Sequence, residues 1–272
     1  MALTAFQRRI CHLVAQNRVA SAASYVAGGA ALNELLAGPR ISRDIDLFHD
    51  TDAAVIASWD ADRRLLEAHG LRVRLVRERP SYVEADVSAS GESVLMEWTR
   101  DSAFRFFPLV EHPEFGLVLH PFDLATNKVL ALIGRLEVRD WIDVITCGER
   151  LQPLGYLAWA ASGKDPGFGP AAILEHAARS SHYSAEEVSA LAFTGTSPEI
   201  GDLSRRWRTL LEGAREIVAV LPAAEIGTCV LTPRGDLFAG DAATAAQAAA
   251  SGGMLFHAGR IRGALPRIVF PS

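Results

Sequence analysis

Long apolar runs, paired cysteines and an excess of basic charge are all missing from this sequence of 272 residues. No apolar stretch approaches the ~18 residues that a membrane-spanning helix needs. The first residues also lack the apolar core of a signal peptide. A formal net charge of −5 argues against a generally basic nucleic-acid binder, although it leaves room for a local basic groove. We therefore expect a cytoplasmic protein that makes no membrane contact.

Cysteine and histidine are too scattered to suggest a metal centre built from them. Cys11, Cys147 and Cys229 lie far apart in the chain, and neither Cys-x-x-Cys nor His-Glu-x-x-His spacing occurs. We interpret the cysteines as reduced, packed thiols and the eight histidines as surface or satisfied residues. The absence of Gly-x-Gly-x-x-Gly also argues against a dinucleotide-binding fold.

A chain of this length fits one large domain or two modest ones. Its first half alternates helical and strand periodicity, with strands expected at 71–76, 82–87 and 93–98 after helices at 4–18 and 52–69. Its second half is mostly helical, with helices expected over 121–135, 137–147, 152–162, 170–180, 184–192 and 199–220. A hairpin is expected from 228–232 and 236–239.

The most informative stretch is residues 25–50, in which two glycines are followed by a short helix and then by two aspartates. Gly28 and Gly29 at a helix start would let phosphate oxygens approach bare backbone N–H groups. Asp44 and Asp46 are two residues apart, so a strand places both carboxylates on one face. This combination indicates metal-assisted chemistry on a nucleotide.

These residues, with the Arg40-Ile-Ser42 that precedes the aspartates, resemble the first motif of the polymerase-β-like nucleotidyltransferases. The resemblance is closest to the AbiEii-type branch, whose members are known as toxin components and as stand-alone genes. It implies an α+β fold, in which helices flank a small mixed sheet and a mainly helical part follows. It also implies that Gly28, Gly29 and Ser42 bind nucleotide.

A third carboxylate is expected near the two aspartates. Glu97 interrupts an otherwise apolar strand, where a buried carboxylate without a partner is costly. The resemblance gives it a role, because family members carry a third acidic residue on a strand antiparallel to the Asp-x-Asp strand. Asp44, Asp46 and Glu97 would then hold Mg²⁺, as two ions, with Mn²⁺ as a substitute. The competing candidates are Glu84, Asp86 and Asp101, and Glu97 could also be a solvent-facing residue of an edge strand.

A second motif, Lys128, Arg135 and Arg139-Asp140-Trp-Ile-Asp143, also resembles the AbiEii-type branch. The resemblance implies that Lys128 contacts nucleotide phosphate and that Asp140 supports the site, with Asp143 as the alternative. The helical pattern places both aspartates opposite a buried face that includes Val138 and Trp141. Without the resemblance, these would be a surface lysine and ordinary ion pairs to Arg135 or Arg139.

The sequence thus predicts three segments: a nucleotidyltransferase core at 1–120, a helical domain at 121–222, and a C-terminal extension at 223–272. The resemblance implies an enzyme that transfers a nucleoside monophosphate from an NTP to a hydroxyl of RNA, protein or a small molecule. It further implies a toxin role with an antitoxin protein as partner. The alternative is a non-catalytic nucleotide-binding or interaction protein that retains the fold.

Overall fold

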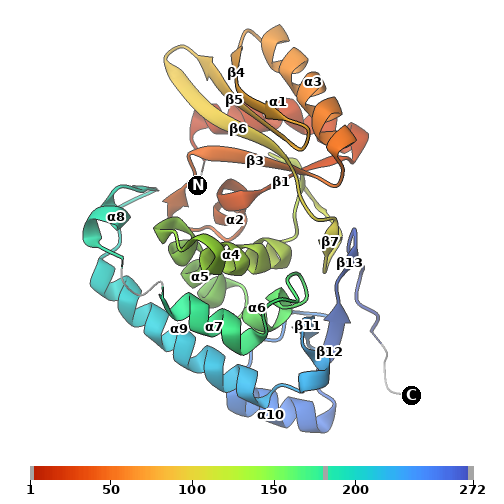
Figure 1. Ribbon diagram of the computed structural model, residues 1–272, viewed down its shortest axis with the longest axis vertical. Helices are drawn as coiled ribbons and strands as arrows, with labels where there is room; N and C mark the ends of the chain where they lie inside the picture. Colours follow the sequence, from red (N-terminus) through yellow and green to blue (C-terminus); the bar gives the residue numbers. More distant parts are fainter. Residues whose placement is uncertain (1–2, 180–182, 269–272) are drawn as a thin grey trace. The chain divides into compact units, whose positions relative to one another are not determined.

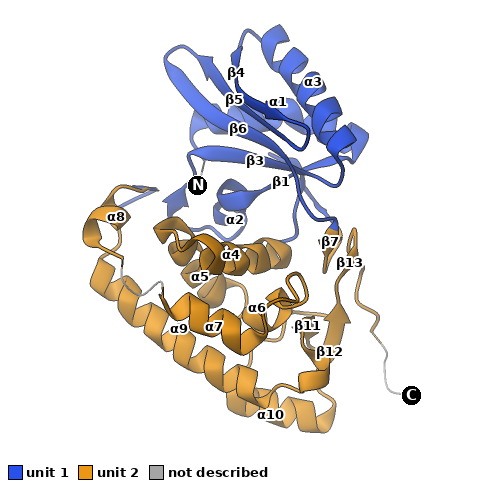
Figure 2. Ribbon diagram, in the orientation of Figure 1, with its two compact units in different colours: residues 1–103, 109–120, 192–195 blue, residues 104–108, 121–191, 196–272 orange. Residues whose placement is uncertain are grey.

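The computed structural model describes residues 3–179 and 183–268, and the chain divides into two compact units (Figures 1 and 2). Unit 1 comprises residues 1–103, 109–120 and 192–195, and unit 2 comprises residues 104–108, 121–191 and 196–272. A boundary lies between His120 and Pro121, whereas none lies at 222. The two C-terminal segments that we distinguished from the sequence therefore belong to one unit.

Unit 1 is built on a seven-stranded mixed sheet with the strand order β4-β5-β6-β3-β1-β9-β8. This confirms the predicted fold class, a small mixed sheet flanked by helices. Its elements are α1 (Ala5–Ser21), β1 (Ser24–Ala27), α2 (Gly28–Leu35), β2 (Arg40–Ile41), β3 (Asp44–His49), α3 (Asp52–Ala68), β4 (Arg72–Arg79), β5 (Tyr82–Ala89), β6 (Glu92–Arg100), β8 (Val110–His112), β9 (Gly116–Val118) and β10 (Ala192–Phe193).

The central strands bury every second residue, as the sequence pattern predicts for a sheet with one covered face. On the covered face, Trp98 packs edge-on against Trp59 of α3, and its indole N–H donates to the buried Asp62 at 2.9 Å. The alternate residues of β3, β5 and β6 are half-buried on the opposite face. That second face is the one that carries the predicted acidic residues.

The expectation that the strand of Glu97 is antiparallel to the Asp-x-Asp strand is wrong, because β3 and β6 are parallel. Helix α3 is a crossover that lets β4 start again in the direction of β3. The two hairpin reversals, from β4 to β5 and from β5 to β6, then cancel each other. Strand β6 therefore returns beside β3 in the same direction.

Unit 2 is mainly helical. Its elements are β7 (Phe104–Arg105), α4 (Pro121–Arg135), α5 (Val138–Arg150), α6 (Leu154–Ala161), α7 (Pro170–Ala178), α8 (Ala185–Ser189), α9 (Ile200–Val220), the 3₁₀ helix η2 (Ala223–Glu225), β11 (Thr228–Leu231), α10 (Ala242–Ser251), β12 (Leu255–Ala258) and β13 (Arg260–Ile261). Residue 180, the predicted end of the 170–180 helix, lies outside the described residues. Within the described part of the chain, no helix combines the length and the apolar character needed to cross a bilayer.

The predicted hairpin of residues 228–232 with 236–239 is present only beside its turn, where the Thr232 N–H donates to the Asp236 carbonyl at 2.8 Å and the Phe238 N–H to the Val230 carbonyl at 3.1 Å. Strand β11 pairs antiparallel with β12, and residues 236–239 contribute only a single bridge, at Leu237. The buried side chain of Gln152 links the two segments, because its amide donates to the backbone carbonyls of Val230 at 3.0 Å and Phe238 at 2.8 Å. Phe238 itself enters a buried apolar cluster with Tyr156.

Candidate active site

The register of the sheet aligns β3, which carries Asp44 and Asp46, with β6, which carries Glu97. Asp46 on β3 lies directly opposite Glu97 on β6, and Asp44 lies one row away on the same face. Neighbouring strands are about 4.8 Å apart, so the carboxylates of Asp46 and Glu97 start from adjacent positions. Glu84 on β5 lies opposite Glu97 in turn. The predicted trio therefore shares one half-buried face of the sheet.

The surroundings of Glu97 show that these carboxylates interact. Burial raises the pKa of Glu97 above its usual value, and the neighbouring charge of Asp46 raises it further. A hydrogen bond from the Tyr82 hydroxyl acts in the opposite direction. Of the competing candidates, Glu84 and Asp86 occupy the same face. Asp101 follows the end of β6, where its N–H donates to the His49 carbonyl at 3.0 Å.

Carboxylate oxygens are the hard ligands that Mg²⁺ prefers, so the chemistry of the predicted trio fits that ion. Among the described residues, however, no three acidic, histidine or cysteine side chains converge closely enough to hold a metal ion. The carboxylate of Asp46 lies against the start of α2, because a Cβ added at Gly28 would fall 1.6 Å from its Oδ2. Metal binding therefore remains a prediction from the donor set and its register.

The two glycines open α2 directly after β1, and their lack of side chains is required here. Ala27 is opposite Asp46 in the β1–β3 ladder, so the helix begins beside the aspartate. Gly28 has a positive φ of 66°. A Cβ on Gly29 would lie 2.2 Å from a guanidinium nitrogen of Arg40 and 3.2 Å from Ser42 Oγ. The start of the helix thus presents backbone beside two polar side chains.

Ser42 is held in place by the N-terminal helix. The Gln7 side chain completes the capping box of α1 with Thr4, and its amide donates to the Ser42 carbonyl at 2.7 Å. Both Ser42 and Arg40 are buried. The structure therefore places the predicted nucleotide-binding Gly29 and Ser42 side by side, together with the buried Arg40 of the same motif, to which the sequence analysis gave no role of its own.

Substituting Gly28→Ala should disable this site more severely than Gly29→Ala. An alanine at Gly28 adds the strain of a positive φ, about 1–2 kcal/mol, and collides with the Asp46 carboxylate. At Gly29 the nearest group is the end of a flexible arginine, which can move. We expect the first variant to lose nucleotide binding in isothermal titration and the second to retain part of it. Equal binding by the two variants would contradict this arrangement.

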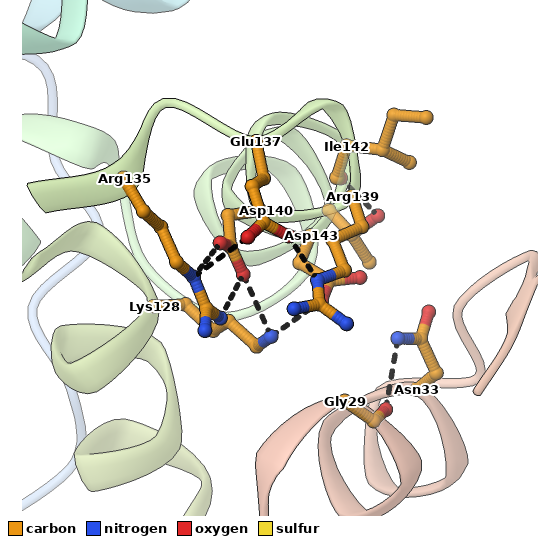
Figure 3. A network of polar contacts seen from close by, with 10 residues as sticks. Gly29, Asn33, Lys128, Arg135, Glu137, Arg139, Asp140, Ile142 and Asp143 are labelled. Atoms are coloured by element: carbon orange, nitrogen blue, oxygen red, sulfur yellow. Dashed lines mark hydrogen bonds and ion pairs between the residues drawn. The ribbon is translucent and has the colours of Figure 1, made fainter. Parts of the chain in front are cut away.

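The second motif forms a buried ion cluster in unit 2 (Figure 3). The ammonium of Lys128 on α4 lies 2.9 Å from Asp140 Oδ1 and 3.0 Å from Asp143 Oδ2 on α5. Arg135 Nε lies 2.6 Å from the second oxygen of Asp140, and its Nη2 donates to the first at 3.0 Å. Arg139 instead pairs with Glu137. Lys128, Asp140 and Asp143 are all buried.

The placement of the two aspartates on an exposed face of α5 is therefore wrong. Both are fully buried, whereas Val138, predicted to be buried, is half-exposed. Burial alone would raise the pKa of Asp140, but the hydrogen bond from Arg135 and the charge of Lys128 outweigh it and hold that pKa below its usual value. Lys128 and Arg135 of α4 supply the positive charges that offset the cost of burying these carboxylates. The helical periodicity of α5 alone cannot reveal these partners.

A row of arginines on β4 was missed by the sequence analysis. Arg74 lies opposite Asp86, Arg77 opposite Glu84, and Arg79 opposite Tyr82. Positions 74 and 77 would normally point to opposite faces, but a bulge between Leu75 and Arg77 restores the alignment. The bulge thus puts these arginines on the acidic face, at the edge of the sheet.

No family model and no curated protein matches this sequence. Two solved structures match with a TM-score of 0.50. JHP933 from Helicobacter pylori is 11% identical, over 78% of this chain and 91% of that one. MenT4, a nucleotidyltransferase toxin from Mycobacterium tuberculosis H37Rv, is 14% identical, over 80% of this chain and 83% of that one.

A third structure, from H. pylori and provisionally described as a nucleotidyltransferase, is 11% identical over 78% of this chain and 94% of that one. Its TM-score is 0.47. The other two structures are only 11% and 14% identical to this chain, so their similarity shows a shared fold. This chain accordingly has the fold of a solved nucleotidyltransferase.

Proposed function

We propose that this protein transfers a nucleoside monophosphate from an NTP to an acceptor hydroxyl in a Mg²⁺-dependent reaction. The observation that carries the proposal is the row formed by Asp46 and Glu97, with Asp44 on the same face and the glycine start of α2 beside it. The acceptor oxygen attacks the α-phosphorus, the bond to the β-phosphate oxygen breaks, and pyrophosphate leaves. Positioning and charge neutralisation supply most of the rate enhancement.

Each predicted residue has a role in this reaction. Asp44, Asp46 and Glu97 would hold the metal, which when bound neutralises charge on the phosphates. Glu97 would also accept the proton of the attacking hydroxyl. The backbone N–H groups of Gly28 and Gly29, with Ser42, bind the triphosphate.

The second motif keeps its predicted roles in this proposal. The resemblance to the AbiEii-type branch is the support for a phosphate-binding role of Lys128, a task that suits a compact ammonium. Asp140 and Asp143 support the site by holding the Lys128 ammonium, which lies about equally close to both carboxylates.

The arginines of β4 favour an acceptor that carries phosphates, and hence the end of an RNA strand. Arg74 and Arg77 contact carboxylates at 3.7 and 3.6 Å, but their side chains are 62% and 57% exposed. Such exposed pairs contribute little and can exchange for a phosphate. The row offers local basic charge that the net charge of the chain conceals. A protein or small-molecule acceptor without phosphates would gain less from this local basic charge.

This proposal is tested by incubating the full chain with each NTP labelled at the α-phosphate, with Mg²⁺ and total RNA. We expect label on RNA together with release of pyrophosphate. Label on a protein or on a small molecule instead would support the transferase activity and identify a different acceptor. If no acceptor is labelled while the protein is folded and binds nucleotide, the non-catalytic alternative is favoured.

The double variant Arg77→Ala with Arg79→Ala should weaken RNA binding and reduce its dependence on salt. Each lost phosphate contact lowers the slope of log affinity against log salt by about 0.7 for a single strand. Filter binding at several salt concentrations measures that slope. The control is Arg205→Ala with Arg208→Ala on the exposed face of α9. A greater effect of the control pair would place RNA on unit 2.

We also propose that the protein acts as the toxin of a toxin–antitoxin pair. The support is the resemblance of its two motifs to the AbiEii-type branch, together with the fold that it shares with MenT4. Controlled expression in a bacterial host would test this, with growth arrest expected for the wild type and normal growth for Asp46→Asn. An antitoxin would then be sought as a protein that restores growth.

A further inference from the structure

One edge of the sheet in unit 1 is an exposed strand with a free side. Strand β4 forms that edge and is hydrogen-bonded to β5 alone (Figure 1). Within the described part of the chain, no backbone hydrogen bond joins residues 72–79 to any other segment. All of these eight residues except Val73 are exposed. Some backbone N–H and C=O groups of β4 therefore point away from β5 and can pair with a further strand.

The side chains on one face of β4 are all basic. Arg72, Arg74, Arg77 and Arg79 lie opposite the half-buried residues of β5, on the acidic face. Arg74 and Arg77 have carboxylates only at 3.7 and 3.6 Å. Among the described residues, Arg72 and Arg79 form no ion pair. This edge is therefore locally positive, in a chain whose net charge is −5.

The other face of β4 offers apolar side chains. Leu75 lies opposite Ala85, and Val76 is the extra residue at the bulge. Their side chains are 46% and 45% exposed. A strand added beside β4 would thus meet arginines on one face and open apolar surface on the other.

We propose that β4 binds an extended segment of another protein, in which acidic and apolar residues alternate, as an additional strand of the sheet. The period of two puts the acidic side chains of this segment beside the arginines and its apolar ones beside Leu75. Main-chain hydrogen bonds hold the segment, and the charges select it. A second copy of this chain does not fit, because two β4 strands would set arginines against arginines.

Such a partner would also regulate the binding of the acceptor. This consequence rests on the proposed function, in which the same arginines bind RNA phosphates. Carboxylates of the added strand occupy Arg77 and Arg79, so RNA loses its contacts with them. The binding of the strand itself needs neither a nucleotide nor catalysis.

The probe is a fluorescent peptide of about eight residues in which glutamate alternates with valine, matching the length of β4. Fluorescence anisotropy with the full chain should show saturable binding that weakens as salt rises. A peptide of the same composition, with its glutamates grouped before its valines, should bind about tenfold more weakly because it cannot match both faces. Binding of the alternating peptide should also slow amide hydrogen exchange in residues 72–79, because free N–H groups of β4 become hydrogen-bonded.

Charge reversal tests the selection of the partner. Arg72→Glu with Arg79→Glu should weaken binding of the glutamate peptide by about tenfold, because attraction becomes repulsion at both ends of β4. The same variant should gain binding of a peptide in which lysine alternates with valine, and this gain shows that it is folded. The control, Arg205→Glu with Arg208→Glu on α9, should change the affinity of neither peptide.

The outcomes separate this inference from the proposed function. Absence of peptide binding, equal binding of the grouped peptide, or unchanged exchange in β4 would overturn strand addition, whether or not the protein transfers nucleotides. RNA that stays bound while the alternating peptide saturates β4 would overturn the regulatory consequence alone. Peptide binding by a protein that turns over no NTP would support strand addition and contradict the proposed function.

Discussion

Asp46→Asn is expected to lower the rate of nucleotide transfer by roughly a hundredfold to a thousandfold, the range for loss of one group that stabilises transition-state charge. The substitution keeps the shape of the side chain and removes the charge opposite Glu97. Single-turnover transfer of labelled nucleotide at saturating NTP measures the effect. Mg²⁺ titration should show weaker dependence on the ion, because one proposed ligand loses its charge.

The same variant should be at least as stable as the wild type. The charge of Asp46 contributes to the raised pKa of Glu97, so the two carboxylates repel each other in the folded state. Removing one of them relieves that repulsion. Asp60→Asn on the exposed side of α3 serves as the matched control and should change neither activity nor stability. Full activity in Asp46→Asn would exclude the proposed role of the acidic face.

Lys128→Ala is expected to lower the free energy of unfolding by about 3–5 kcal/mol, the cost of removing one partner from a buried ion pair. It would leave two fully buried carboxylates without the ammonium that lies between them. For a chain of this size, each kcal/mol lowers the melting temperature by about 2–4 °C. Urea unfolding monitored by circular dichroism measures the loss. Arg205→Ala on exposed α9 should cost about 0.5 kcal/mol or less.

A double-mutant cycle distinguishes the ion cluster from simple packing. Asp143→Asn should cost clearly less stability in the Lys128→Ala background than in the wild type, because the interaction that it removes is already lost. Additive losses would mean that the two residues do not interact. Because Lys128→Ala perturbs folding, its effect on triphosphate binding has to be measured well below its melting temperature.

In the C-terminal half, the local sequence pattern predicts the helices but not the pairing of the strands. The helices of α4 to α9 follow from apolar spacing, and so does the strand at 228–231. The partner of that strand does not, because β12 lies beyond α10 in the chain and its pairing depends on long-range packing. The buried charges of α5 have the same explanation. A three-residue spacing puts Asp140 and Asp143 on one side, but only α4 makes that side an interior one.

By itself, the sequence determined the local chemistry: glycines at a helix start, and two aspartates that a strand's period of two places on one face. These follow from neighbouring residues alone. Only the tertiary structure decided which groups join them. The α3 crossover set β6 parallel to β3 with Glu97 opposite Asp46, and the bulge in β4 turned Arg77 and Arg79 to that face. Strand direction, register and bulges depend on hydrogen bonds between distant segments, which no local pattern encodes.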